Sequence, residues 1–159
     1  MPQLLVLGSA PCLEDDLALL DVSAFDAAAV NRAGCRYAGR IGWWVTYHPS
    51  IMLDEGWAQQ RARIGGNDDY TLVLHEPHVD AQRQAMRGVI FPGPAVTGSS
   101  TLLAVTFGLA HGYEHIVVAG APLQGNYTNF QAGWKRARKQ LAGRVSSMSG
   151  WTKTFLESL

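Results

Sequence analysis

His48 is the side chain in this sequence whose type and position best suit acid–base chemistry. It follows the apolar run 41–47 and directly precedes Pro49. Histidine titrates near neutral pH, so at the end of a strand that faces a ligand it can accept or release a proton. A hydrogen-bonded turn residue without a chemical role fits the same position. The sequence therefore marks His48 as the candidate catalytic residue and leaves a structural role open.

Two serines stand where a helix is predicted to begin. Ser99 and Ser100 open the apolar segment 99–111, which ends at Gly112. One serine is enough to cap a helix. The second hydroxyl and the free N–H groups of the first turn favour a ligand with phosphate or sugar oxygens. Both serines are therefore predicted ligand contacts, although capping and local turns explain such residues as well.

A second loop, Gly8-Ser9-Ala10-Pro11, follows the first apolar run of the chain. Glycine permits close backbone approach, and proline suits the first turn of a following helix, whose N-terminus attracts anions. The loop matches neither G-x-G-x-x-G nor the Walker pattern with its lysine. Gly8, Ser9 and Pro11 are predicted ligand contacts, with an ordinary tight turn as the alternative.

Further candidates follow two other predicted strands. Asn31 ends the run 25–31, and its amide offers both a donor and an acceptor to a nucleoside or sugar hydroxyl. Arg32, the next residue, is a further predicted ligand contact. Gly120 ends the run 114–120, and Tyr127 lies shortly after it with a hydroxyl able to bind phosphate. An Asx turn at Asn31 and packing by Tyr127 are the structural alternatives.

No metal site is predicted. His75, Glu76 and His78 have ligand-like spacing, but no further ligand is evident elsewhere in the sequence. Cys12 and Cys35 form no C-x-x-C pair, so neither a zinc site nor a disulfide framework is indicated.

The elements that must position these residues alternate along the chain. Short apolar runs at 3–8, 25–31, 41–47, 70–74, 88–91 and 114–120 predict strands buried on both faces, and helices are predicted at 11–20, 52–63, 99–111, 130–141 and from 151. This alternation predicts an α/β fold of Rossmann-like type, a three-layer α/β/α arrangement with a mainly parallel sheet. Residues 1–159 are predicted to form one domain. Ligands of such sheets bind beyond the carboxyl ends of the strands.

Composition limits the partners of the chain. Its 13 basic residues balance 13 acidic ones, which argues against nucleic acid as a partner. One basic cluster, formed by Lys135, Arg136, Arg138, Lys139 and Arg144, fits a solvated helix face. No apolar run approaches the roughly 20 residues that span a bilayer. We expect a cytoplasmic protein without a cleaved leader, and its 47% hydrophobic residues suit a homo-oligomer.

The order of these motifs resembles the bacterial sialyltransferases of glycosyltransferase family 42. The likeness rests on the Gly8 loop, Asn31, Tyr47-His48-Pro49-Ser50, the serine pair with Thr101, and residues 112–120, over about 3–127. The same motifs are also similar to the Rossmann-like 6-hydroxymethyl-dihydropterin pyrophosphokinases.

The resemblance implies a CMP-sugar as substrate or ligand and no separate cofactor. It assigns donor contacts to Gly8, Ser9, Asn31, Ser99 and Ser100, and assigns Gly120 and Tyr127 to the nucleotide and its phosphate. The family loop usually reads Gly-Asn/Lys-Gly-Pro-Ser, whereas this chain has Ser9, Ala10 and Cys12 at the comparable places. The family's lid histidine has no counterpart, because residues 146–151 contain no histidine.

Three functions stay open from the sequence. The first is a nucleotide-sugar transferase in which His48 or a lid hydroxyl replaces the missing base. The second is a non-catalytic nucleotide- or sugar-phosphate-binding protein of phage or prophage origin, because fold alone does not fix activity. The third is pterin or nucleotide pyrophosphoryl transfer, which needs magnesium and carboxylates that the named strand ends lack.

Overall fold

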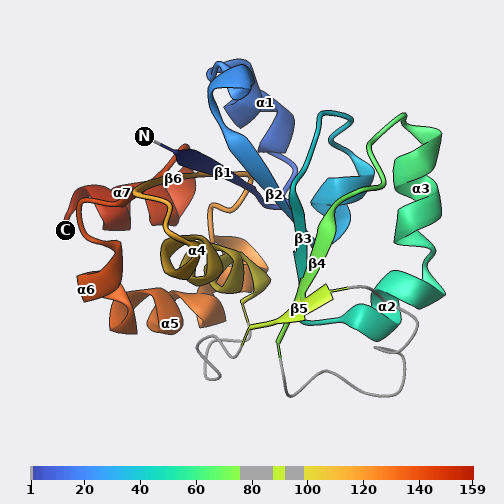
Figure 1. The fold of residues 1–159 in the computed structure, drawn as a ribbon. Coiled ribbons are helices and arrows are strands. Elements are labelled where there is room, and N and C mark those ends of the chain that lie inside the picture. Colours follow the sequence, from blue (N-terminus) through green and yellow to red (C-terminus); the bar gives the residue numbers. More distant parts are fainter. Residues whose placement is uncertain (1, 76–87, 92–98) are drawn as a thin grey trace.

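One parallel sheet organises the part of the chain that the computed structural model describes, residues 2–75, 88–91 and 99–159. Its strand order is β5-β4-β3-β2-β1-β6-β7, and every neighbouring pair is parallel (Figure 1). The strands are β1 (Gln3–Leu7), β2 (Asp26–Val30), β3 (Trp43–Thr46), β4 (Thr71–Leu74), β5 (Gly88–Ile90), β6 (His115–Ala119) and β7 (Val145–Ser147).

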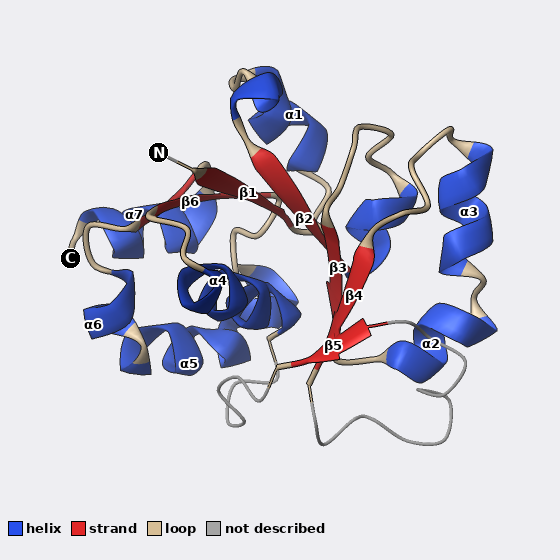
Figure 2. Cartoon of the chain, in the orientation of Figure 1, coloured by secondary structure: helices blue, strands red, loops and turns tan. Residues whose placement is uncertain are grey.

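Helices cover both faces of this sheet (Figure 2). One face carries α4 (Ser100–His111), α5 (Gln131–Arg136), α6 (Arg138–Leu141) and α7 (Gly150–Glu157). The other face carries α1 (Leu13–Ala18), α2 (Pro49–Asp54) and α3 (Trp57–Arg63). The Rossmann-like three-layer α/β/α fold predicted from the sequence is therefore confirmed.

The strands are buried on both faces because successive side chains point to opposite sides. In β1, Leu4 and Val6 join the core beneath α4, whereas Leu5 and Leu7 join the core beneath α1. All four side chains are fully buried. The continuous apolar run thus fills two cores at once, which is why it lacks the polar alternation of a half-exposed strand.

The strand order reverses between β1 and β6. From β1 the chain proceeds outward through β2, β3, β4 and β5, and α4 then returns it to β6 on the other side of β1. A ligand crevice is expected at such a reversal, beyond the carboxyl ends of the two strands. The loops that follow β1 and β6, beginning at Gly8 and Gly120, are therefore the first place to look for a site.

Three predicted segments differ from the structure. The helix predicted at 52–63 is two helices, because Gly56 adopts a left-handed conformation (φ 64°) between α2 and α3. The helix predicted at 130–141 is divided into α5 and α6 at Ala137. Between the helices predicted at 130–141 and from 151, where no strand was predicted, lies β7, an edge strand that pairs with β6 although it has only one apolar residue.

Arg61 holds together the loops on the α3 side of the sheet. Its side chain is 1% exposed, and its guanidinium donates to the carbonyl oxygens of Gly34, Tyr37, Gly39 and Asn67 at 2.7–3.0 Å. It also donates to the Asn67 side chain at 2.6 Å. The guanidinium group has five N–H donors in a fixed planar geometry, so it can bond all of these acceptors. The single ammonium group of a lysine could not.

Replacing Arg61 by methionine is expected to lower the free energy of unfolding by about 3 kcal/mol, because several buried carbonyl groups lose charged donors. Urea unfolding followed by circular dichroism measures this change. Arg63→Met is the matched control, since Arg63 lies two residues away on the same helix and is exposed. Equal stability of the two variants would contradict the assigned role.

No helix within the described ranges is long and apolar enough to span a membrane.

Candidate functional site

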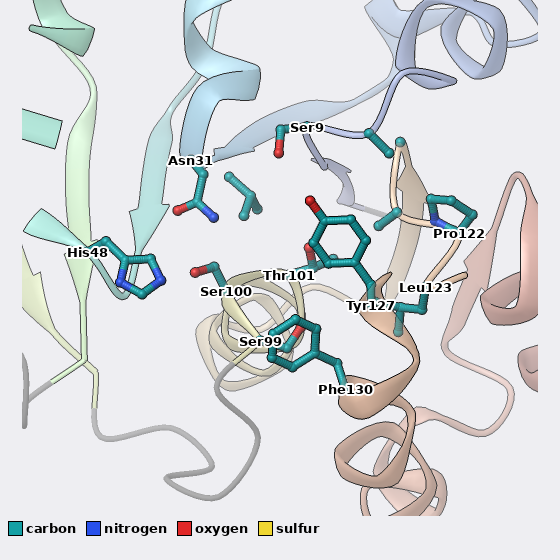
Figure 3. Close-up of a pocket in the computed structure, with 14 residues that line it drawn as sticks. Ser9, Asn31, His48, Ser99, Ser100, Thr101, Pro122, Leu123, Tyr127 and Phe130 are labelled. Atoms are coloured by element: carbon teal, nitrogen blue, oxygen red, sulfur yellow. The ribbon is translucent and has the colours of Figure 1, made fainter. Parts of the chain in front are cut away.

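A cavity of about 180 Å³ opens at the carboxyl ends of β1, β2, β3 and β6, on the side of the sheet that α4 covers (Figure 3). The α4 N-terminus forms one wall and the segment after β6 forms the opposite wall. Its described lining residues are Ser9, Ala10, Val30, Asn31, His48, Ser99, Ser100, Thr101, Gly120, Ala121, Pro122, Leu123, Tyr127 and Phe130.

Most of the residues singled out from the sequence lie together on this lining. The structure brings together the candidate catalytic residue and the candidate contacts from separate loops, namely His48, Ser9, Asn31, Ser99, Ser100, Gly120 and Tyr127. The imidazole of His48 lies on the same side of the cavity as Asn31 and Ser100 (Figure 3). Gly8, Pro11 and Arg32 do not belong to the lining.

Gly8 has a structural reason to be glycine that the sequence did not reveal. Its N–H donates to Ala119 O at 2.7 Å, and the N–H of Ala10 donates to Gly120 O at 3.0 Å. A Cβ added to Gly8 would lie 2.3 Å from Gly120 O, and one added to Gly120 would lie 2.5 Å from Gly8 O. The two loops are therefore joined to each other, and this close approach of their backbones requires glycine at position 8.

Arg32 and Pro11 point to other tasks. The Arg32 guanidinium forms an ion pair with Glu55 and lies 6.0 Å from the centre of the Trp57 ring. The Glu55 carboxylate in turn accepts from Trp57 Nε1 at 2.7 Å, and both hydrogen bonds lower the pKa of Glu55. Pro11 is exposed in the turn before α1. Neither residue faces the described cavity.

The α4 N-terminus supplies the polar wall. Ser99 caps the helix by accepting from Leu102 N at 3.3 Å, and the Ser100 hydroxyl accepts from Tyr47 N at 3.2 Å. Each serine thus has a structural bond, and Thr101 adds a third hydroxyl to the lining. The first N–H groups of a helix have no partner within it, and the helix dipole adds partial positive charge there. This wall suits an anionic group.

Asn31 is held in an uncommon conformation at the end of β2. Its φ is 51°, in the left-handed region that asparagine tolerates better than most residues. Its carbonyl oxygen accepts from Trp44 Nε1 at 2.7 Å, and its side-chain Oδ1 accepts from the Thr46 hydroxyl at 2.8 Å. The Asx turn considered from the sequence is replaced by two bonds to β3. Figure 3 shows the amide nitrogen on the side of the cavity centre.

Two aromatic rings form the wall opposite His48. Tyr127 and Phe130 lie in the 3₁₀ segment Gly125–Phe130, with ring centroids 6.3 Å apart and planes 27° apart. Tyr127 is 58% exposed, so its ring is not packed under the loop. Its hydroxyl points across the cavity toward the side where Ser9 lies (Figure 3). A ring available on one face and an exposed hydroxyl suit a planar or phosphorylated ligand.

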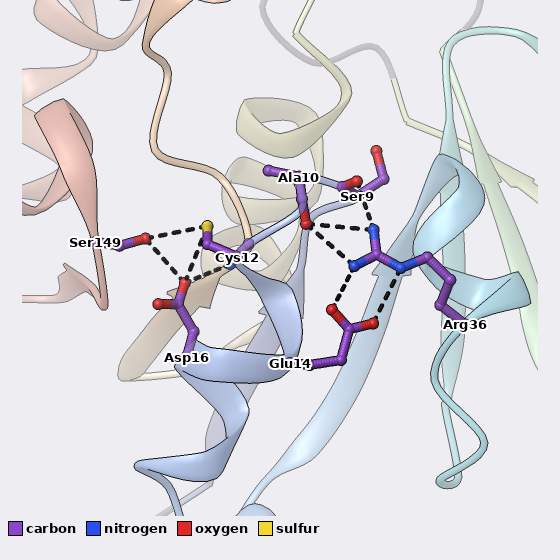
Figure 4. A network of polar contacts seen from close by, with 8 residues as sticks. Ser9, Ala10, Cys12, Glu14, Asp16, Arg36 and Ser149 are labelled. Carbon is purple, nitrogen blue, oxygen red and sulfur yellow. Dashed lines mark hydrogen bonds and ion pairs between the residues drawn. The ribbon is translucent and has the colours of Figure 1, made fainter.

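A buried carboxylate joins the segments behind the cavity (Figure 4). Asp16, 5% exposed, accepts from Gly120 N at 2.8 Å and from the Ser149 hydroxyl at 2.9 Å. The Cys12 sulfur lies 3.8 Å from the same carboxylate oxygen and 3.5 Å from Ser149 Oγ. Asp16 therefore ties α1 to the loop after β6 and to the segment before α7.

Arg36 fixes the first loop from outside the cavity. Its guanidinium donates to Ser9 O at 2.6 Å and to Ala10 O at 3.2 Å, and it forms an ion pair with Glu14 (Figure 4). The Arg36 hydrogen bond lowers the pKa of Glu14. Arg36 therefore holds the backbone of the loop after β1, while Asp16 holds that of the loop after β6.

Several lining residues carried no signal strong enough to identify them from the sequence. Val30, Ala121 and Leu123 contribute backbone and apolar surface and resemble residues at any strand end or loop. Phe130 lies three positions after Tyr127, the spacing that aligns two side chains in a 3₁₀ turn, so this spacing could have identified it. Pro122, two residues after the predicted Gly120, could have been found by its position.

No lining residue in the described ranges carries a permanent charge. Nor do the described residues contain a cluster of histidine, cysteine or carboxylate groups that could hold a metal ion. Glu76 and His78, considered with His75 from the sequence, lie outside the described residues. The described cavity offers neutral donors and a helix dipole, not the carboxylates that magnesium-dependent pyrophosphoryl transfer needs.

Comparison with solved structures finds the sialyltransferase CstII from Campylobacter jejuni, in complex with the substrate analogue cytidine-5′-monophosphate. The match has a TM-score of 0.62 at 13% sequence identity and covers 96% of this chain and 81% of that chain. At this identity the likeness is one of fold. No protein-family model matches the chain, and no curated protein matches it. The chain is thus similar in fold to a sialyltransferase, as the sequence motifs suggested.

Proposed function

We propose that this protein binds a nucleoside monophosphate, free or as part of a CMP-sugar, in the cavity between the α4 N-terminus and Tyr127. The observation that carries this proposal is the N-terminus of a 12-residue helix opening into a strand-end cavity whose described lining carries no fixed charge. One phosphate can be met there by helix N–H groups and hydroxyls. A triphosphate would bring more charge than such a site compensates.

The other walls suit the rest of a nucleotide. The Asn31 amide can bond a ribose or base atom or a phosphate oxygen, and the Tyr127 ring and hydroxyl stand across from it. The fold likeness to a protein solved with cytidine-5′-monophosphate supports CMP as the first nucleotide to test.

If the protein is a transferase, His48 is its proposed general base. In transfer from a CMP-sugar, the bond between the anomeric carbon and the phosphate oxygen breaks, CMP leaves, and the acceptor hydroxyl forms the new bond. The acceptor's proton then passes to His48, acting as general base. The α4 N-terminus stabilises the charge that develops on the departing phosphate. This assigns to His48 the role that the lid histidine has in the family it resembles.

Isothermal titration with CMP, CDP, UMP, AMP and ATP, with and without magnesium, tests the binding proposal. Selective binding of CMP, weakened strongly by Asn31→Ala, is the expected result. Failure of all five nucleotides to bind would overturn the proposal. ATP binding that depends on magnesium would instead favour pyrophosphoryl transfer.

A non-catalytic binding protein is the second candidate. The absence of histidine from residues 146–151 favours it, because the family's lid base then has no counterpart there. Release of CMP from a CMP-sugar separates the two candidates: turnover supports the transferase, and tight binding without turnover supports the binding protein.

A further inference from the structure

One buried hydroxyl lies beneath both Asn31 and His48. Thr46, at the end of β3, is 0% exposed and does not line the cavity. Its Oγ1 lies 2.8 Å from Asn31 Oδ1 and 2.9 Å from the backbone N of His48. A single side chain therefore contacts the candidate ligand-binding residue and the candidate base.

The donor and the acceptor in each of these two hydrogen bonds follow from the protons that each group carries. The backbone N–H of His48 can only donate, so the Thr46 oxygen is the acceptor in that bond. The one hydroxyl proton of Thr46 then has to be donated elsewhere, since an unmet buried donor is costly. The Asn31 side chain lies within reach, and of the two ends of its amide only Oδ1 can accept. If the Asn31 amide were flipped, an N–H group would point at the Thr46 oxygen and the Thr46 proton would lose this acceptor.

We propose that Thr46 is a positioning residue that makes Asn31 a hydrogen-bond donor toward the cavity. With Oδ1 held by Thr46, the Nδ2 group lies on the cavity side, as Figure 3 shows. The bond from Trp44 Nε1 to Asn31 O fixes the backbone at the same residue. The ligand atom that meets Asn31 is therefore an acceptor, such as a phosphate or carbonyl oxygen. This inference rests on the proposed nucleotide site and specifies which end of the Asn31 amide that site uses.

Thr46→Val removes the hydroxyl at nearly constant shape, and Thr46→Ser retains it. We expect Thr46→Val to weaken CMP binding about tenfold, because the Asn31 amide is no longer held in one orientation, and Thr46→Ser to stay within about twofold. In an Asn31→Ala background Thr46→Val should cause no further loss, since residues that act through one another are not additive. Urea unfolding of each variant verifies that it is folded.

A measurement on the unmodified protein keeps the inference testable even if Thr46→Val does not fold. In ¹⁵N–¹H spectra, the side-chain NH₂ signals of Asn31, assigned by their loss in Asn31→Ala, should shift on addition of CMP. Those of the exposed Asn126 and Asn129 should not. CMP binding with unmoved Asn31 signals, or undiminished binding by Thr46→Val, overturns the positioning role and leaves the proposed function standing.

If the unmodified protein binds no nucleotide, the proposed function is overturned, but the positioning role of Thr46 can still be tested. The orientation of Asn31 is then read from the ligand-free spectra. Thr46→Val should still move the Asn31 NH₂ signals and Thr46→Ser should not. Where Thr46→Val does not fold, a displacement of the Asn31 NH₂ signals by Thr46→Ser, which keeps the hydroxyl, would overturn the positioning role as well.

Discussion

A Gly120→Ala variant is expected to lose about 3 kcal/mol of unfolding free energy, a large part of the stability of a domain of this size. Two costs add. Gly120 has φ 69°, which is unfavourable for alanine by about 1 kcal/mol. The added methyl group would also lie 2.5 Å from Gly8 O and 2.9 Å from a Leu13 methyl, a contact that overpacking data place at about 1–3 kcal/mol.

Two other glycines separate these costs. Gly112 has φ 103° but nothing within 4 Å of its added Cβ, so Gly112→Ala reports the conformational cost alone. Gly8 has no positive φ, and its added Cβ would lie 2.3 Å from Gly120 O, so Gly8→Ala reports the contact alone. Chemical unfolding should rank Gly112→Ala as the mildest of the three. Equal stability of the Gly112 and Gly120 variants would mean that the loops after β1 and β6 are not in contact.

Asn31→Asp is expected to weaken CMP binding about a hundredfold. The substitution preserves the size of the side chain, its tolerance of the left-handed region and an acceptor for Thr46. It replaces the donor that faces the cavity with a negatively charged oxygen. Loss of a hydrogen bond to a charged group costs about 1.5–3 kcal/mol, and repulsion of the phosphate adds to that cost.

Isothermal titration measures this difference against a control of equal charge. Asn129→Asp adds the same negative charge on the exposed 3₁₀ segment near the cavity, outside its lining. It should bind CMP nearly as the unmodified protein does. If the two variants were equally affected, long-range charge and not the Asn31 amide would govern binding.

The sequence predicted the sheet well because each inner strand is a short apolar run bounded by turn residues. Residues 3–8 and 114–120 show this pattern, and they form β1 and β6, two adjacent inner strands of the sheet. The edge strand β7 was missed because Val145-Ser146-Ser147 is too polar and too short to stand out. Its strand conformation comes from pairing with β6, which is information that the segment does not contain.

Candidate site residues were found where polar or glycine residues end predicted strands or open a predicted helix, and three of them, His48, Asn31 and Ser100, line one cavity. The rule could not distinguish lining residues from residues that position them. Gly8 supports the neighbouring loop, and Arg32 pairs with Glu55 away from the described cavity. Thr46 could not be identified from the sequence, because a threonine inside a strand that is rich in β-branched residues has no distinguishing feature.

The bonds between the loops after β1 and β6 have a consequence for the energetics of binding. Ala10 and Gly120 are joined through their backbones, and Asp16 and Arg36 hold the same loops from behind. The conformational entropy of these walls is therefore lost when the chain folds and not when a ligand arrives. Because a preorganised surface loses little entropy on binding, more of the free energy of each contact contributes to affinity. A small ligand with few polar groups can therefore still bind in this cavity, although none of its described walls carries a fixed charge.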